Sequence, residues 1–150
     1  AEDMYQAVVS NLDENDVVIK SAAVADYKPK TYSDNKIKKK DGDLVIELDR
    51  NKDIAYEIGK IKNDKILVGF AAETNDIIEN AKAKIAKKNM DFIVANNLKE
   101  SGAGFGTDTN IVSIIEKDGS MKEYPMMTKE EVASVILDKI KTLLDNKSSL

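Results

Sequence analysis

The sequence predicts an α/β fold of three layers, Rossmann-like, with a mainly parallel sheet and an antiparallel hairpin arm. Three apolar runs, typical of strands buried in a parallel sheet, alternate with stretches of helical periodicity. The runs cover residues 17–25, 65–72 and 91–95. Residues 32–50 interrupt this alternation. They hold the turn signal Asp41-Gly42, followed by Leu44, Ile46 and Leu48 alternating with other residues, a pattern that predicts an antiparallel arm.

The chain has 150 residues, enough for one domain spanning residues 1–150 with a single good core. It contains neither cysteine nor histidine, which excludes disulfides, thiolate chemistry, zinc–sulfur sites and imidazole catalysis. The net charge of −4 argues against nucleic-acid binding. No apolar run reaches membrane-spanning length and no signal peptide is visible, so we expect a cytoplasmic protein with no membrane contact.

Helical periodicity predicts helices over residues 3–13, 51–60 and 76–88, and a last helix that starts at Thr128. Thr128 and Glu131 have the spacing of a capping box. Residues 111–115 and 121–124 flank a turn and predict a hairpin. We expect the chain to fray from residue 146 onwards.

The first apolar run is expected to end on Asp26, with pairing stopped near Pro29. Ligands of open parallel sheets bind beyond the carboxyl ends of the strands. A dense lysine cluster, residues 36–40, follows on the arm. Together they favour a metal–nucleotide or other polyphosphate site. The alternative is a plain turn aspartate and a solvated edge of lysines.

Other features also allow two interpretations. Lys84 and Lys88 share a helix face, either as solvated lysines or as a cationic surface for phosphates. Phe70 is either a core aromatic or part of a ligand pocket. The glycine-rich segment 101–106 leads into a strand, so it is weak evidence for a phosphate cradle; a flap beside the site or a plain connection remain possible. No strand precedes a glycine fingerprint that opens a helix, which disfavours a nicotinamide-binding domain.

Five segments resemble, in order, the motifs of phosphopantothenoylcysteine synthetase: residues 21–29, 36–39, 68–74, 91–97 and 105–110. The resemblance covers nearly the whole chain and indicates an enzyme of coenzyme A biosynthesis. It implies that CTP activates the carboxylate of 4'-phosphopantothenate to an acyl-cytidylate with release of pyrophosphate. Cysteine then displaces CMP to form the amide.

The resemblance also implies roles for particular residues. Lys36, the first lysine of a Lys-x-Lys-Lys motif, would be catalytic and stabilise charge at the α-phosphate. Asp26 would contact the nucleotide or its Mg²⁺, and Lys84 and Lys88 would hold the phosphate tail. The complete set of implied nucleotide-binding residues is Ala22, Asp26, Lys36, Asn51, Asp53, Phe70, Lys84 and Lys88.

Two positions depart from the motifs of that family. Residues 50–53, Arg-Asn-Lys-Asp, resemble Lys-Asn-Pro-Asp but have Lys52 in place of the proline. Asn97 stands where the family usually has an acid, which removes a charge there.

The resemblance further implies a homodimer formed through an arm of about residues 30–50. FMN would belong only to a fused decarboxylase domain outside this chain. The chain resembles the later portion of the synthetase, without the glycine-rich segment that opens full members. The alternative to the ligase is therefore a catalytically incomplete module that binds nucleotide and dimerises. The preference for CTP over ATP is left open by the sequence.

Overall fold

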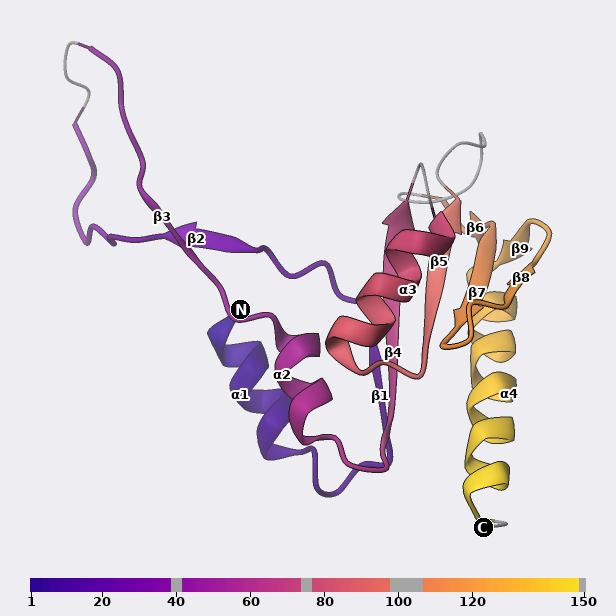
Figure 1. Cartoon of the computed structure of the whole chain (residues 1–150). Helices are drawn as coiled ribbons and strands as arrows, with labels where there is room; N and C mark the ends of the chain where they lie inside the picture. Colours follow the sequence, from indigo (N-terminus) through magenta and orange to yellow (C-terminus); the bar gives the residue numbers. More distant parts are fainter. Residues whose placement is uncertain (39–41, 74–76, 98–106, 149–150) are drawn as a thin grey trace.

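A computed structural model describes residues 1–38, 42–73, 77–97 and 107–148 (Figure 1). Its centre is a five-stranded sheet in the order β1-β4-β5-β7-β8. The five strands are β1 (Val17–Lys20), β4 (Ile66–Glu73), β5 (Phe92–Asn97), β7 (Val112–Glu116) and β8 (Met121–Glu123). The first three are parallel, and β7 and β8 each run antiparallel to the strand before them in the sheet.

Helices cover both faces of this sheet and create three layers. On one face, α1 (Glu2–Ser10), α2 (Ile54–Ile61) and α3 (Ile77–Lys88) share a core with alternate residues of β4 such as Leu67 and Ala71. On the other face, α4 (Lys129–Ser148) packs on the residues of β4 that point the opposite way, such as Ile66 and Val68. The predicted three-layer α/β class is therefore confirmed.

The first strand is shorter than its apolar run predicts. The expected extension to Asp26 is wrong, because β1 ends at Lys20. Within the described part of the chain, β1 pairs with β4 alone, and Ile19 is 40% exposed. A strand with one open edge leaves part of its apolar surface uncovered, so β1 is not buried on both faces. A shallow groove with Val8 and Leu12 among its lining residues runs between α1 and this strand.

The arm forms its ladder at the base, where Leu48 of the alternating residues takes part. β2 (Tyr27–Pro29) pairs with β3 (Leu48–Arg50), antiparallel, and Pro29 is the last residue of its strand, as expected for a residue without an N–H. Leu44 and Ile46 lie outside the ladder and are exposed. Of the predicted turn, Asp41 lies outside the described residues, and Gly42 has a positive φ of 102°. The arm extends away from the body of the domain (Figure 1).

Helix ends differ from the sequence-based bounds in both directions. The first helix ends at Ser10, so Leu12 is buried from the turn that follows and not from the helix. The chain was expected to fray over residues 146–150, but α4 continues to Ser148 and Lys147 donates to the carbonyl oxygen of Asp64. Residues 149–150 lie outside the described residues. No helix of the described residues is long and apolar enough to span a membrane.

The capping box of α4 is confirmed in both directions. The Thr128 amide donates to Oε2 of Glu131 at 2.8 Å, and the Glu131 amide donates to Oγ1 of Thr128 at 3.2 Å. Just before the helix, β9 (Met127–Thr128) pairs with β6 (Thr109–Asn110) in a separate two-stranded sheet. The predicted hairpin is also present, as β7 and β8.

Candidate functional site

The turn between β3 and α2 meets the loop that follows β1. Asn51 donates from its side-chain amide to the carbonyl oxygen of Ala25 at 2.8 Å, and its backbone amide donates to the carbonyl oxygen of Asp26 at the same distance. Two segments that are about 25 residues apart in the sequence are thus joined at the base of the arm. Ala22 lies in the same loop, with its carbonyl accepting from the Val24 amide at 3.2 Å.

Asp53 connects this turn to the last turn of α3. Its Oδ2 lies 2.8 Å from Nζ of Lys88, while its Oδ1 accepts from the Tyr56 amide at 3.2 Å and caps α2. Partial burial alone raises the pKa of Asp53. The hydrogen bonds from Lys88 and Tyr56, with the charge of nearby Lys20, outweigh that effect and hold the pKa below its usual value. Asp53 is therefore an anion at neutral pH.

Lys52, between these two residues, contacts the first helix. Its Nζ lies 2.8 Å from Oε1 of Glu2 and 4.3 Å from the centre of the Tyr5 ring. The neighbouring charges lower the pKa of Glu2 and raise that of Lys52, chiefly through their shared hydrogen bond. Sequence reasoning noted Lys52 only as a departure from the family motif and missed its partner, because no local pattern reveals a contact between residues 2 and 52.

Asp26 is exposed, at the end of the loop and immediately before β2. Among the described residues, no group of three or more acidic side chains gathers to form a metal cage. Mg²⁺ in nucleotide sites commonly takes one or two carboxylates and completes its shell with phosphate oxygens and water. A single exposed carboxylate fits that donor set, so Asp26 could hold a nucleotide-bound Mg²⁺.

Lys36 lies on the arm and is exposed. Its neighbours Lys39 and Lys40 fall outside the described residues. The arm segment that carries Lys36 extends away from the body, whereas Lys84 and Lys88 lie on α3 (Figure 1). One chain in this conformation does not bring Lys36 together with the two helix lysines.

Phe70 and the helix lysines belong to opposite faces of the sheet. Phe70 is half-buried and packs on the core beneath α4. Lys84 and Lys88 are partly buried on α3, whose Ala81 and Ile85 pack on the other face. A ligand that touches both must therefore cross the rim of the sheet. The glycine-rich segment 101–106 lies outside the described residues.

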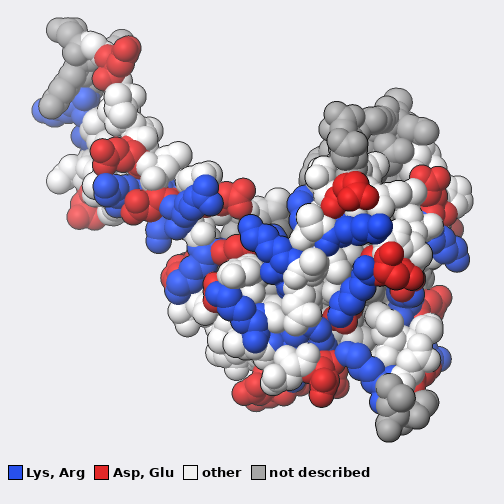
Figure 2. Space-filling view, in the orientation of Figure 1, with Lys and Arg blue, Asp and Glu red and all other residues white. Residues whose placement is uncertain are grey.

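Basic side chains gather on the face of the body that carries α2 and α3, while basic and acidic side chains are interspersed along the arm (Figure 2). Helix α3 contains four lysines: Lys82, Lys84, Lys87 and Lys88. The overall charge of −4 is thus unevenly distributed, and the surface near the candidate site is cationic.

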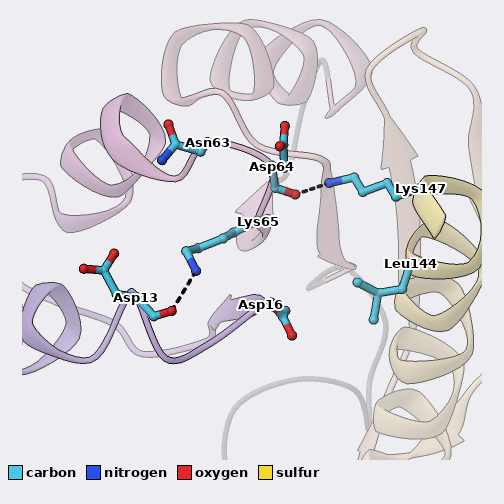
Figure 3. A pocket seen from close by; sticks show the side chains of 7 residues that line it. All are labelled: Asp13, Asp16, Asn63, Asp64, Lys65, Leu144 and Lys147. Atoms are coloured by element: carbon cyan, nitrogen blue, oxygen red, sulfur yellow. Dashed lines mark hydrogen bonds between the residues drawn. The ribbon is translucent and has the colours of Figure 1, made fainter. Parts of the chain in front are cut away.

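A separate cavity of about 590 Å³ lies away from the candidate site, at the amino ends of β1 and β4 (Figure 3). Lys65 donates there to the carbonyl oxygens of Asp13 and Asn15, and Lys147 donates to that of Asp64. Both lysines are engaged by backbone oxygens, and carboxylates line the remaining wall. The cavity is unsuited to a polyphosphate and serves to join the end of α4 to the turns beneath the sheet. Its lining residues are Asp13, Asp16, Asn63, Asp64, Lys65, Leu144 and Lys147.

The topology defines a three-layer α/β domain in which the loop after β1 lies beyond the carboxyl end of that strand, the place where open parallel sheets bind their ligands. The chain belongs to the family described as DNA/pantothenate metabolism flavoprotein C-terminal domain, which matches residues 1–144. This finding confirms the resemblance seen in the sequence.

Individual relatives agree with that assignment. The chain is 54% identical over 143 residues to the coenzyme A biosynthesis bifunctional protein CoaBC of Bacillus subtilis, covering 95% of this chain and 35% of that protein. It is 48% identical over 145 residues to a cysteine/cysteine sulfinic acid decarboxylase of an unknown prokaryotic organism, covering 96% of this chain and 40% of that protein. The chain therefore spans well under half the length of these relatives.

A solved structure has the same fold. The crystal structure of the C-terminal domain of CoaBC superposes with a TM-score of 0.78 at 44% identity, covering 97% of this chain and 65% of that one. About a third of that solved domain has no counterpart in the present chain.

Proposed function

We propose that this chain takes part in the CTP-dependent ligation of 4'-phosphopantothenate with cysteine, a step of coenzyme A biosynthesis in the cytoplasm. The observation that carries the proposal is the junction made by Asn51, which joins the loop of Ala22 and Asp26 to the turn of Asp53. These are the residues that the family resemblance assigns to the nucleotide. The relatives named CoaBC support the pathway.

The chemistry needs no histidine or cysteine side chain of the protein. A carboxylate oxygen of phosphopantothenate attacks the α-phosphorus of CTP, and the bond to the β-phosphate breaks to release pyrophosphate. The amine of cysteine then attacks the acyl carbon, loses a proton and displaces CMP. The protein's task is to position the reactants and to neutralise the charge that develops on the α-phosphate.

Lys36 is proposed as the catalytic residue and Lys84 as a contact to the phosphate tail. Mg²⁺, held by Asp26 and the phosphates, would offset charge on the nucleotide. Because the arm extends from the body, we propose that Lys36 completes the site of a second copy in a homodimer formed through residues 30–50. Phe70 would flank the nucleotide from the other side of the sheet rim. FMN is not proposed for this chain.

A Lys36→Gln substitution tests the catalytic role. In a protein that turns over, the variant should form acyl-cytidylate at least about 100-fold more slowly, because one preorganised cation near the α-phosphate is lost. Pyrophosphate release measures the rate, and circular dichroism should show an unchanged fold, since Lys36 is exposed. The matched control is Lys141→Gln, an exposed lysine on α4 and outside the lysine cluster of the arm. Wild-type rates in the Lys36 variant would refute the role.

The second candidate is a nucleotide-binding and dimerisation module without turnover. It is favoured by the separation of the arm segment that carries Lys36 from α3 within one chain. Incubation with CTP, Mg²⁺, phosphopantothenate and cysteine separates the two. Pyrophosphate release supports the ligase, and calorimetric binding of CTP without pyrophosphate supports the module. The same titration with ATP measures base preference.

A further inference from the structure

Two asparagine side chains meet near the carboxyl end of β5. Asn110, on β6, donates from Nδ2 to Oδ1 of Asn96, on β5, at 3.0 Å. The Oδ1 atom of Asn110 accepts from the backbone amide of Ile111, also at 3.0 Å. Asn110 is only 8% exposed, and Asn96 is half-buried. A buried side-chain amide that is hydrogen-bonded at both its oxygen and its nitrogen is held in one orientation.

The backbone determines the direction of both hydrogen bonds. The N–H of Ile111 can only donate, so the Asn110 atom that it meets is the side-chain oxygen. The other branch of Asn110 is then its NH2 group, which can only donate, so the Asn96 atom that it meets is again an oxygen. Asn96 therefore carries its NH2 group on the branch that lies away from Asn110.

The register of the strands places Asn96 on the same face of the sheet as Phe70. Val94 and Phe70 are partners in register, and both belong to the core beneath α4. Asn96 is two residues past Val94, so it lies on that face and nearer to the carboxyl end of the strand. Its partners across the sheet are Ala72 on β4 and Val112 on β7. Ligands of open parallel sheets bind beyond this edge.

We propose that Asn110 is a positioning residue of the nucleotide site, because it fixes the amide of Asn96 with the NH2 group toward the carboxyl edge shared by β4 and β5. Asn110 directly precedes β7 in the chain and so approaches Asn96 from the β7 side, which leaves the NH2 branch toward β4 and Phe70. The inference rests on the proposed function for what binds there. The ligand atom that Asn96 meets is an acceptor of the nucleotide, an oxygen or a ring nitrogen, and a donor in its place is rejected.

Two substitutions of Asn110 distinguish positioning from support of the fold. Asn110→Asp keeps the size of the side chain and, as a carboxylate, accepts from both Ile111 and Asn96. It therefore turns the Asn96 amide around, and the affinity for CTP should fall at least about tenfold, because an oxygen then faces the ligand acceptor. Asn110→Ala removes both bonds and lets Asn96 adopt either orientation, so the affinity should fall only about two- to threefold.

Calorimetric titration with CTP measures both affinities in the whole chain. A residue that only supported the fold would give the opposite order, because alanine loses two hydrogen bonds and aspartate keeps both partners. A larger loss in Asn110→Ala than in Asn110→Asp therefore overturns the proposal.

Met126→Asp controls for the charge that Asn110→Asp introduces. Met126 is 46% exposed and directly precedes Met127, the partner of Asn110 in the small sheet, so the same charge is added nearby at an exposed position. The affinity for CTP should change less than about twofold in this variant. If Met126→Asp weakens CTP binding as much as Asn110→Asp does, charge alone explains the loss and the positioning role is refuted.

The orientation of Asn96 is measured without nucleotide, by NMR scalar coupling across the hydrogen bond between the two side chains. In the wild type, Nδ2 of Asn110 should couple to Cγ of Asn96. In Asn110→Asp, Nδ2 of Asn96 should couple to Cγ of residue 110. Asn96 as the donor in the wild type overturns the proposal, and so does a reversed coupling in the variant with unchanged CTP affinity. If the wild-type chain binds no CTP, the proposed function fails together with the ligand contact, and the couplings still decide how Asn110 orients Asn96.

Discussion

The side chain of Asp91 links three parts of the fold by hydrogen bonds. Lying just before β5, it accepts hydrogen bonds from the Leu67 amide at 2.8 Å, from Lys62 at 2.9 Å and from Lys117 at 3.1 Å. Lys62 is only 4% exposed and also donates to the carbonyl oxygen of Lys65. A buried lysine is tolerated because a carboxylate and a carbonyl satisfy its charge and its donors.

We predict that Asp91→Asn destabilises the fold by about 3 kcal/mol at pH 7, since Lys62 keeps a buried charge without its counterion. Burial alone raises the pKa of Asp91, but the hydrogen bonds from Leu67 and the two lysines hold it below the ordinary 3.8. A lowered folded pKa stabilises the protein fully above the unfolded value and loses that contribution as pH falls through the folded value.

Urea denaturation at several pH values checks this prediction. The difference in unfolding free energy between wild type and Asp91→Asn should be constant at neutral pH and narrow below about pH 4. Asp43→Asn, an exposed change on the arm, is the control and should leave the free energy of unfolding within about 0.5 kcal/mol. A difference that stays the same at pH 7 and pH 3 would contradict the assignment.

At single residues the sequence was informative where the chemistry is local. The pairing of Thr128 with Glu131 follows from a three-residue spacing, and the structure contains both bonds. The Lys88–Asp53 pair joins residues 35 positions apart, and no periodicity can reveal it. Lys88 therefore has an acidic partner from another element, although its own helix offers none at the usual spacing.

At the scale of elements, the packing of α2 on α3 depends on the absence of a side chain at Gly59. Alanine is favoured over glycine in helices by about 1 kcal/mol. Here the added Cβ would meet the Lys88 carbonyl oxygen, which is backbone and cannot rotate away. We predict that Gly59→Ala lowers the free energy of unfolding by about 2 kcal/mol despite its better propensity.

Urea denaturation measures that change, and Lys60→Ala at the next, exposed position is the comparison. Among the described residues, Lys60 pairs with Glu57 one turn earlier in the same helix and lies over the Tyr56 ring. Its loss should therefore cost about 0.5 kcal/mol or less. A Gly59→Ala protein as stable as wild type would show that the two helices can separate at no cost.

The sequence predicted the bounds of elements closely where the hydrophobic pattern is strong, and less closely where it is weak. The run 65–72 became β4 with a shift of one residue, because its continuous apolar character matches a central strand. The run 17–25 was overestimated, since small alanines are compatible with a strand but do not require one, and β1 ends at Lys20. The hydrophobic pattern of a strand does not reveal whether the strand lies in the centre or at the edge of the sheet.

At the scale of the whole molecule, the three layers could be predicted from the alternation of apolar runs with helical stretches. The contacts that join the loop after β1, the turn between β3 and α2, and helix α3 could not be predicted in this way. The order of strands in the sheet is set by contacts between distant segments, such as β1 with β4 across the entire arm. The candidate site residues were predicted from resemblance to family motifs, and the structure adds which of them are in contact.

The arm carries the last prediction, because its apolar residues lack a covering layer within the described chain. Tyr32 is 89% exposed, Val45 82% and Leu44 71%. A two-stranded ribbon is marginal alone in water, and apolar side chains on it are expected to be buried by association. We predict that the chain forms a dimer through these residues, as the proposed site requires.

A double substitution, Leu44→Asp with Val45→Asp, should weaken the dimer at least about 100-fold, since each copy loses two apolar side chains worth about 1.5 kcal/mol or more. Sedimentation equilibrium measures the dissociation constant. Leu137→Asp is the matched control, because Leu137 is exposed on α4, in the body of the domain, and should leave the dimer intact. If the arm variant dimerises as well as wild type, the arm is not the interface and Lys36 cannot reach a second site in this way. If the wild-type chain is a monomer at millimolar concentration, the same conclusion follows without any variant.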